Sequence, residues 1–242
     1  MNRILIPALV GAICIAVGIS AAQGKPNLQL KESCHSALDL PRFSVKQFKK
    51  QREQLAVLVL DTRSGDEFLK GFIPGSINIG FKGPFDTFLE QVIPNKEQKL
   101  LLVVEPPDYK AVADRLAQLG YTGAIGLLDG GIDRWKDQEP IDSVPNLTAQ
   151  KFRKRSDQGH IVDVRTTKEF EKGHIDNAMN IPLVDFATFG STLKKGDAPM
   201  YVHCQSGYRS AIAASILRIK GFKNVCNIQG GYKALKDEIK EN

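Results

Sequence analysis

One cysteine of the chain lies in a segment whose residue types suit nucleophilic chemistry on anions. Cys204 is followed by Gln205, Ser206, Gly207, Tyr208 and Arg209. The thiolate is the reactive form of cysteine, and an ordinary thiol is mostly protonated at neutral pH. Small residues let a loop curl so that backbone N–H groups converge on an anion, and arginine adds a permanent positive charge. The segment therefore predicts a loop that stabilises a thiolate, a persulfide or a bound oxyanion.

The elements around this loop place it where ligands bind. Residues 200–203 form a short apolar run that predicts a buried strand, and residues 210–220 repeat apolar side chains at helical spacing until Gly221 ends the helix. The loop thus joins the carboxyl end of a strand to the start of a helix, which is where open α/β folds bind ligands. The alternative is that Cys204 is only a small buried hydrophobe at the end of a strand.

The chain contains an internal duplication. Residues 60–73 match residues 162–175 with Asp, Arg, Glu, Phe, Lys, Gly and Ile in register, and residues 128–131 match residues 228–231. Each copy alternates apolar runs with amphipathic stretches, which predicts an α/β fold with a mainly parallel sheet and helices on both faces. We expect domains at residues 42–140 and 146–242, joined by a linker at residues 140–146 that contains two prolines.

The second copy resembles the rhodanese-type sulfurtransferases. The resemblance rests on the Cys204 loop and on four further segments, which are Asp163–Arg165, Glu169–Phe170, Gly173–Ile175 and Gly230–Tyr232. It extends over nearly all of residues 42–240 as two rhodanese domains. The pair is also similar to the rhodanese modules that follow a metallo-β-lactamase-type domain in some bacterial persulfide-dioxygenase fusions, although these 242 residues contain no such metal domain.

The resemblance implies sulfur transfer by double displacement. Cys204 would take a sulfane sulfur from thiosulfate or a persulfide and pass it to a thiol or to cyanide, with Gln205–Arg209 binding the substrate and no metal or cofactor. The loop has four residues between Cys204 and Arg209, whereas tyrosine-phosphatase-type loops have five. Two alternatives stay open: a persulfide carrier that does not turn over, and a cysteine-dependent phosphatase.

Several polar residues receive structural interpretations. Asp163 and Arg165 recur as Asp61 and Arg63 in the first copy, so we expect structural roles, with Arg165 paired to Glu169.

The remaining histidines and cysteines also receive structural interpretations. We expect His174 to pack or cap, His203 to be hydrogen-bonded at a strand end, and Cys226 to be buried in a strand. Cys34 is expected to be an exposed thiol. Removal of an N-terminal signal that contains Cys14 would leave Cys34, Cys204 and Cys226, an odd number that predicts at least one unpaired or intermolecular cysteine.

The first copy is predicted to be inactive. A gapless alignment of the two loops places Glu105 opposite Cys204, and a carboxylate does not carry sulfane sulfur. Pro106 and Pro107 remove two backbone N–H donors, and Asp108 stands in place of a flexible glycine. We expect this half to stabilise its partner, shape the cleft or dock another protein.

The first residues predict export. Met1–Arg3 precedes an apolar run at residues 4–19 and then Ser20–Ala22, a pattern typical of a secretory signal peptide at residues 1–22, with an uncleaved membrane anchor as the alternative. We therefore expect a periplasmic or secreted protein that is not inserted in the membrane after cleavage. The net charge is +6, but the basic residues are interleaved with acidic ones along the chain, which argues against a nucleic-acid partner and favours anionic sulfur donors. We also expect a protein of sulfur metabolism as a partner.

Overall fold

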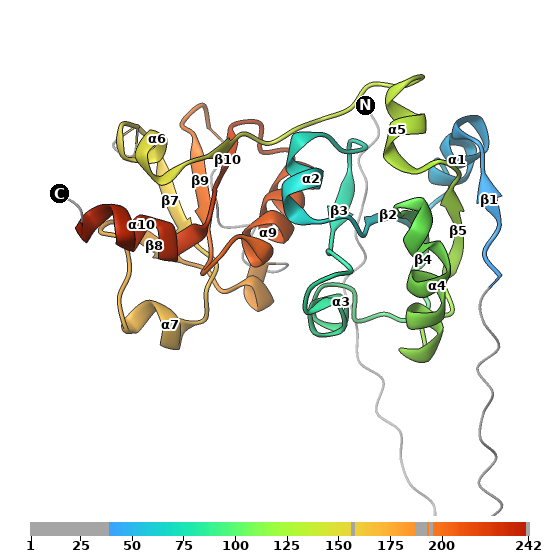
Figure 1. The fold of residues 1–242 in the computed structure, drawn as a ribbon, viewed down its shortest axis with the longest axis horizontal. Helices are drawn as coiled ribbons and strands as arrows, with labels where there is room; N and C mark the ends of the chain where they lie inside the picture. Colours follow the sequence, from blue (N-terminus) through green and yellow to red (C-terminus); the bar gives the residue numbers. More distant parts are fainter. Residues whose placement is uncertain (1–38, 156–157, 187–192, 194–195, 241–242) are drawn as a thin grey trace, which may run out of the picture. The chain divides into compact units, whose positions relative to one another are not determined.

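The N-terminal domain contains a parallel sheet of five strands. The computed structural model describes residues 39–240 except 156–157, 187–192 and 194–195 (Figure 1). The strand order of the first sheet is β1-β5-β4-β2-β3, and every pairing in it is parallel. The strands are β1 (Arg42–Phe43), β2 (Val57–Asp61), β3 (Ser76–Asn78), β4 (Lys99–Val103) and β5 (Ala124–Leu128). The helices are α1 (Val45–Arg52), α2 (Gly65–Lys70), α3 (Phe85–Val92), the 3-10 turn η1 (Pro106–Asp108), α4 (Tyr109–Gln118) and α5 (Gly131–Lys136).

The C-terminal domain repeats this topology. Its strand order is β6-β10-β9-β7-β8, again with parallel pairings throughout. The strands are β6 (Asn146–Leu147), β7 (His160–Asp163), β8 (Ala178–Asn180), β9 (Met200–His203) and β10 (Val225–Ile228). The helices are α6 (Ala149–Arg153), α7 (Thr167–Glu171), the 3-10 turn η3 (Leu183–Asp185), α9 (Tyr208–Ile219) and α10 (Gly231–Lys240). The predicted α/β class, with two sheets flanked by helices, is confirmed.

Apolar side chains on both faces of each sheet account for the helix layers. In the C-terminal domain, Met200 and Val202 pack in one core with helix α9, whereas Tyr201 points to the opposite face and packs with Phe152 of α6 and Leu235 of α10. Alternate residues of a strand point to opposite faces, so Met200–Val202 of β9 are all apolar because both faces of the strand are covered. The predicted strand at residues 200–203 is confirmed, and the predicted helix begins two residues earlier than expected, at Tyr208.

Matching caps start the second helix of each domain. The Ser64 hydroxyl accepts the Glu67 backbone N–H at the start of α2, and the Thr166 hydroxyl accepts that of Glu169 at the start of α7. Each glutamate reaches back to the N–H of its capping residue, which completes a capping box in both domains. A hydroxyl residue followed three positions later by glutamate is the sequence pattern of such a box, and both helices have it.

Helix α9 contacts both domains. Residues 35–242 form one compact unit, and within it eight consecutive residues of α9, from Ser210 to Leu217, are buried. The Asn78 backbone N–H at the end of β3 donates to the Ser215 hydroxyl at 3.1 Å. A helix of a single α/β domain is usually exposed on one side, so burial all round reflects the contact with the N-terminal domain.

The predicted linker is ordered against its neighbours. Phe72 and Asp142 exchange two backbone hydrogen bonds of 2.8 and 2.9 Å, and the Asp142 carboxylate pairs with Arg218 of α9 at 2.6 Å. Asn146, at the predicted end of the linker, is the first residue of strand β6. In the described part of the chain, no helix is long and apolar enough to cross a membrane. The predicted signal peptide at residues 1–22 and Cys34 lie outside the described residues.

Candidate active site

Cys204 lies directly after strand β9, with its sulfur held by the loop that follows. The residue is 1% exposed, and the Gly207 backbone N–H donates to its Sγ at 3.1 Å. Gly207 has a φ of 120°, a conformation that glycine adopts without steric cost. The turn thus brings one backbone donor onto the sulfur at the first residues of α9, where the helix dipole also favours negative charge.

A second helix fixes the backbone of the cysteine from behind. The Tyr232 N–H, at the start of α10, donates to the Cys204 carbonyl at 2.7 Å, and the Lys233 N–H donates to the Gln205 carbonyl at 3.2 Å. Gly231 allows this approach, because a Cβ there would overlap the Cys204 carbonyl oxygen. The Gly230–Gly231–Tyr232 segment therefore holds the loop in place.

Arg209 is held beside the cysteine by Glu169. The guanidinium donates to both carboxylate oxygens, at 2.6 and 2.7 Å. This bidentate hydrogen bond is the main cause that lowers the pKa of Glu169 to about 2. The same bond raises the pKa of Arg209, and the neighbouring Cys204 sulfur adds to the rise. Arg209 thus presents a fixed positive charge at the site.

The predicted Arg165–Glu169 ion pair is wrong. Arg165 instead pairs with Asp163 at 2.6 Å, and both side chains are almost fully buried. Its guanidinium also donates to the Gly173 carbonyl at 2.8 Å and lies over the Tyr232 ring, 3.9 Å from the centroid. Glu169 was assigned the wrong arginine because its partner Arg209 is forty residues away in sequence.

The same buried pair occurs in the N-terminal domain. Arg63 pairs with Asp61 at 2.5 Å and donates to the Gly71 carbonyl at 2.9 Å. Because the pair is present in the domain that has no cysteine loop, the structural interpretation of Asp163 and Arg165 is supported.

The two predicted structural histidines have the expected surroundings. His174 stacks on Phe170 and its Nδ1 lies 3.0 Å from the Phe170 carbonyl oxygen, near the end of α7. His203 is fully buried, with Nδ1 3.3 Å from the Cys204 carbonyl oxygen and Nε2 3.8 Å from the Asp163 carboxylate. Burial is the main cause that lowers the pKa of His203, so the ring is neutral at physiological pH.

Four of the five predicted substrate-binding residues lie at the mouth of the loop or beside the sulfur, and the fifth, Tyr208, contacts the other domain. Gln205 and Ser206 are exposed at the mouth of the loop, and Gly207 and Arg209 lie beside the sulfur as described above. Tyr208 differs, because its hydroxyl donates to the Gly80 carbonyl of the N-terminal domain at 2.7 Å. Its ring packs near Phe88, with 5.4 Å between the ring centroids, and burial raises its pKa. The Tyr208 side chain is thus committed to a contact between domains.

The alignment that placed Glu105 opposite Cys204 is wrong by one residue. Asp61 of β2 is paired with Val103, whereas its counterpart Asp163 is paired with His203. His203 therefore corresponds to Val103, and Cys204 corresponds to Val104.

The glycines behind the loops give the same correspondence. A Cβ at Gly131 would lie 3.0 Å from the Val104 carbonyl oxygen, and a Cβ at Gly231 would overlap the Cys204 carbonyl oxygen. Valine has no nucleophilic atom, so the position of the sulfur is filled by hydrocarbon in the N-terminal domain. Glu105 is the next residue, and burial raises the pKa of its carboxyl.

The other predicted cysteine environment is only partly correct. Cys226 lies in strand β10 as expected, but it is half-buried rather than buried, and burial raises the pKa of its thiol. Among the described residues, no group of three or more His, Cys, Asp or Glu side chains is placed to hold a metal ion.

Comparison with known proteins gives the family. The family model for the rhodanese-like domain matches residues 44–138 and again residues 148–238. The chain is 38% identical over 94 residues to the uncharacterised protein YqhL of Bacillus subtilis, a match that covers 39% of this chain and 74% of that protein.

Two further relatives carry names from sulfur chemistry. The chain is 34% identical over 98 residues to the putative sulfur carrier protein YrkF of Bacillus subtilis, covering 39% of this chain and 52% of the relative. It is 38% identical over 74 residues to the thiosulfate sulfurtransferase GlpE of Shewanella oneidensis, covering 31% of this chain and 72% of the relative. These relatives support sulfur transfer in general. The two matched regions and the two repeated sheets establish that the chain belongs to the rhodanese family, with two rhodanese-like domains in tandem.

Proposed function

We propose that the protein is a sulfurtransferase in which Cys204 carries a sulfane sulfur between a donor and a thiophilic acceptor. The observation that carries the proposal is the placement of Cys204, whose Sγ accepts the Gly207 N–H at 3.1 Å beside the arginine that Glu169 holds. A backbone donor and a fixed cation suit a sulfur that is negative both as a thiolate and as a persulfide.

The reaction takes place in two displacements. The Cys204 thiolate attacks the outer sulfur of thiosulfate, the S–S bond of the donor breaks, and sulfite leaves with the electron pair. The persulfide on Cys204 then gives its terminal sulfur to cyanide or to a thiolate, which forms thiocyanate or a new persulfide and restores the thiolate. A persulfide donor reacts in the same way and leaves a thiolate in place of sulfite. No oxidant is consumed, and the kinetics are ping-pong.

The donor and the compartment are part of the proposal. Thiosulfate and a low-molecular-weight persulfide are the two donors to test, the latter because of the resemblance to the rhodanese pair of persulfide-dioxygenase fusions. We propose a periplasmic or secreted location on the basis of the signal pattern at residues 1–22. We further propose that the N-terminal domain is inactive, because Val104 stands where Cys204 stands and Pro106 and Pro107 follow it.

The purified protein should be assayed for transfer from thiosulfate and from a low-molecular-weight persulfide, each to cyanide and to a thiol, with Cys204→Ser as control. We expect turnover in the wild type and none above background in the variant. A wild type that gives no turnover with either donor, while a persulfide-loaded partner protein loads Cys204, would replace the enzyme with a sulfur carrier. Hydrolysis of an aryl phosphate that depends on Cys204 would instead assign a phosphatase.

A further inference from the structure

The Cys204 loop has a contact with the N-terminal domain that sulfur transfer does not itself require. Tyr208 is the first residue of α9 and follows Gly207, the residue whose N–H reaches the sulfur. Its side chain leaves its own domain, donates to the Gly80 carbonyl at 2.7 Å and packs near Phe88. Gly207, whose N–H donates to the Cys204 sulfur, is therefore directly followed by a residue whose side chain is anchored in the N-terminal domain.

The N-terminal domain is shaped to receive this ring. A Cβ at Gly83 would overlap the Tyr208 ring, lying 2.7 Å from Cδ2 and closer still to Cε2. A Cβ at Gly80 would lie 3.4 Å from the same ring. Two glycines thus leave the space that the tyrosine fills, and any side chain at Gly83 would displace it.

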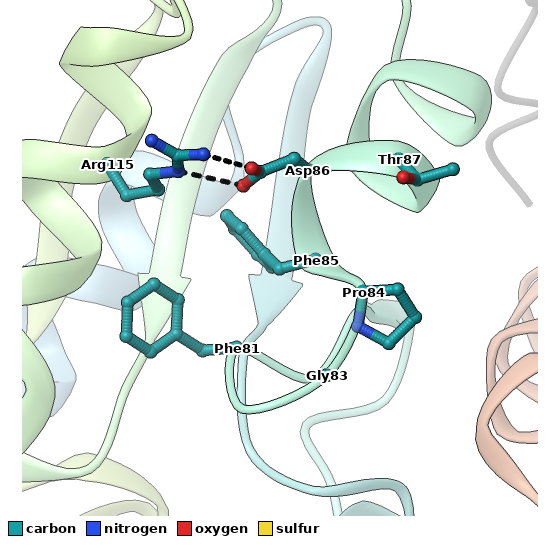
Figure 2. A pocket seen from close by; sticks show the side chains of 7 residues that line it. All are labelled: Phe81, Gly83, Pro84, Phe85, Asp86, Thr87 and Arg115. Carbon is teal, nitrogen blue, oxygen red and sulfur yellow. Dashed lines mark hydrogen bonds and ion pairs between the residues drawn. The ribbon is translucent and has the colours of Figure 1, made fainter.

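The segment that receives the ring is itself fixed. Figure 2 shows Gly83 between Phe81 and Pro84, at the point where the chain enters α3. Phe81 packs edge-on against Phe85, with 5.4 Å between centroids, and its N–H donates to the Thr62 carbonyl at 2.8 Å.

Two ion pairs hold the ends of this segment. Asp86, in the first turn of α3, forms a two-bond pair with Arg115 of α4 that is drawn in Figure 2. Lys82 pairs with Asp108 at 3.0 Å, which ties the segment to the turn after β4. These pairs and the Phe81 N–H bond to the Thr62 carbonyl connect the segment that contacts Tyr208 to the rest of the N-terminal domain.

We propose that Tyr208 is a positioning residue through which the N-terminal domain sets the geometry of the Cys204 loop. This rests on the proposed function only in that the loop carries the sulfur chemistry. Tyr208 acts through its neighbour Gly207, whose N–H it keeps directed at Sγ, and the pocket formed by Gly80, Gly83 and Phe88 is the part of the N-terminal domain that does this.

The test is a double-mutant cycle across the two domains on the full chain. Gly83→Ala, Tyr208→Ala and the double variant are compared with the wild type by the rate at which iodoacetamide alkylates Cys204, followed on the Cys204 peptide by mass spectrometry. We expect each single variant to slow alkylation at pH 7 by about tenfold, the lower end of the scale of one lost hydrogen bond to a charged group. In the double variant the alanine at Gly83 meets no ring, so the effects should not multiply.

Controls separate positioning from stability. Gly196→Ala is a matched glycine substitution with no atom within 4 Å of the new Cβ, and its rate should equal that of the wild type. Asp142→Asn removes the ion pair with Arg218 at the linker, and it should lower the melting temperature without slowing alkylation. Tyr208→Phe keeps the ring and should recover most of the rate lost in Tyr208→Ala.

The proposal is overturned if Gly83→Ala and Tyr208→Ala alkylate at the wild-type rate, or if their effects simply multiply in the double variant. Failure of the proposed function would be visible separately. In that case the wild type shows no Cys204-dependent sulfur transfer, while the alkylation cycle still reports whether Tyr208 positions the loop.

Discussion

The two domains share a scaffold and differ in the loop after the fourth strand of each sheet in chain order. Both keep the buried Asp–Arg pair, the capping box and a glycine that lets the last helix approach that loop. In one loop Cys204 is followed by residues that deliver the Gly207 N–H to its sulfur. In the other, Val104 is followed by Glu105 and then by two prolines that begin a 3-10 turn. The comparison teaches that the scaffold fixes where the loop lies, while the residues of the loop determine whether a backbone N–H is directed at the residue that follows the strand.

The arginine beside Cys204 also distinguishes the two domains. Glu169 of α7 holds Arg209, whereas its counterpart Glu67 of α2 caps its helix and forms no ion pair within 4 Å among the described residues. The capping role is therefore shared and the pairing role is specific to the C-terminal domain.

The largest predicted effect comes from exchanging the residues at the equivalent positions. Cys204→Val should abolish sulfur transfer, because it places in the C-terminal loop the side chain that the N-terminal loop already has. Val104→Cys in that background should not restore activity, since Pro106 and Pro107 supply no N–H groups. Thiosulfate-to-cyanide assays would check both variants, and activity regained through Val104→Cys would show that the loop backbone matters little.

The next largest effect is a loss of stability that should be the same in the two domains. Asp61→Asn and Asp163→Asn each leave a buried arginine without its carboxylate, and the loss of one partner of a buried pair costs about 3–5 kcal/mol. Urea unfolding would measure the cost of each. Similar losses would support a shared structural role, whereas a much smaller loss for Asp163→Asn would mean that the pair in the C-terminal domain serves something other than stability.

A smaller effect should separate the two glutamates. Glutamine keeps the capping box, so Glu169→Gln removes only the charge that holds Arg209. We expect kcat/KM for thiosulfate to fall about tenfold, as for loss of a charge-assisted hydrogen bond. Glu67→Gln is the matched control and should leave kcat/KM unchanged. Equal effects of the two substitutions would contradict a specific role for Glu169.

The smallest predicted effect is a difference in acid stability. The pKa of Glu169 is lowered from 4.5 to about 2, chiefly by Arg209. A carboxyl whose pKa is lower in the folded state stabilises the fold above its unfolded pKa, and this stabilisation is lost as the pH falls through the folded pKa. The melting-temperature gap between wild type and Glu169→Gln should therefore be constant above about pH 5 and narrow towards pH 2. A gap that widens on acidification would contradict the ion pair.

Local patterns in the sequence predicted most of the elements around the site. The strand at residues 200–203, the cap at Thr166 and the loop before α9 could be predicted, because apolar spacing and capping residues act over a few positions. The partner of Glu169 could not be predicted in this way. Arg209 follows β9 and Glu169 follows β7, and these strands lie next to each other only in the folded sheet.

The register of the two loops was missed for a related reason. Helix α4 begins at Tyr109, five residues after Val104, whereas α9 begins at Tyr208, four residues after Cys204. The spacing of landmarks therefore differs between the copies, and a gapless alignment slips. Strand pairing gives the correct alignment, because Asp61 pairs with Val103 and the equivalent Asp163 pairs with His203. The contact of Tyr208 with Gly83 was likewise invisible in sequence because it joins two domains.

The most direct test of the account is mass spectrometry of the native protein after incubation with thiosulfate and removal of excess donor. The account predicts a gain of one sulfur on the peptide that contains Cys204, no gain on the peptide that contains Cys226, and loss of the added sulfur when cyanide is supplied. A wild-type protein that gains no sulfur on Cys204 from thiosulfate or from a persulfide donor would contradict it.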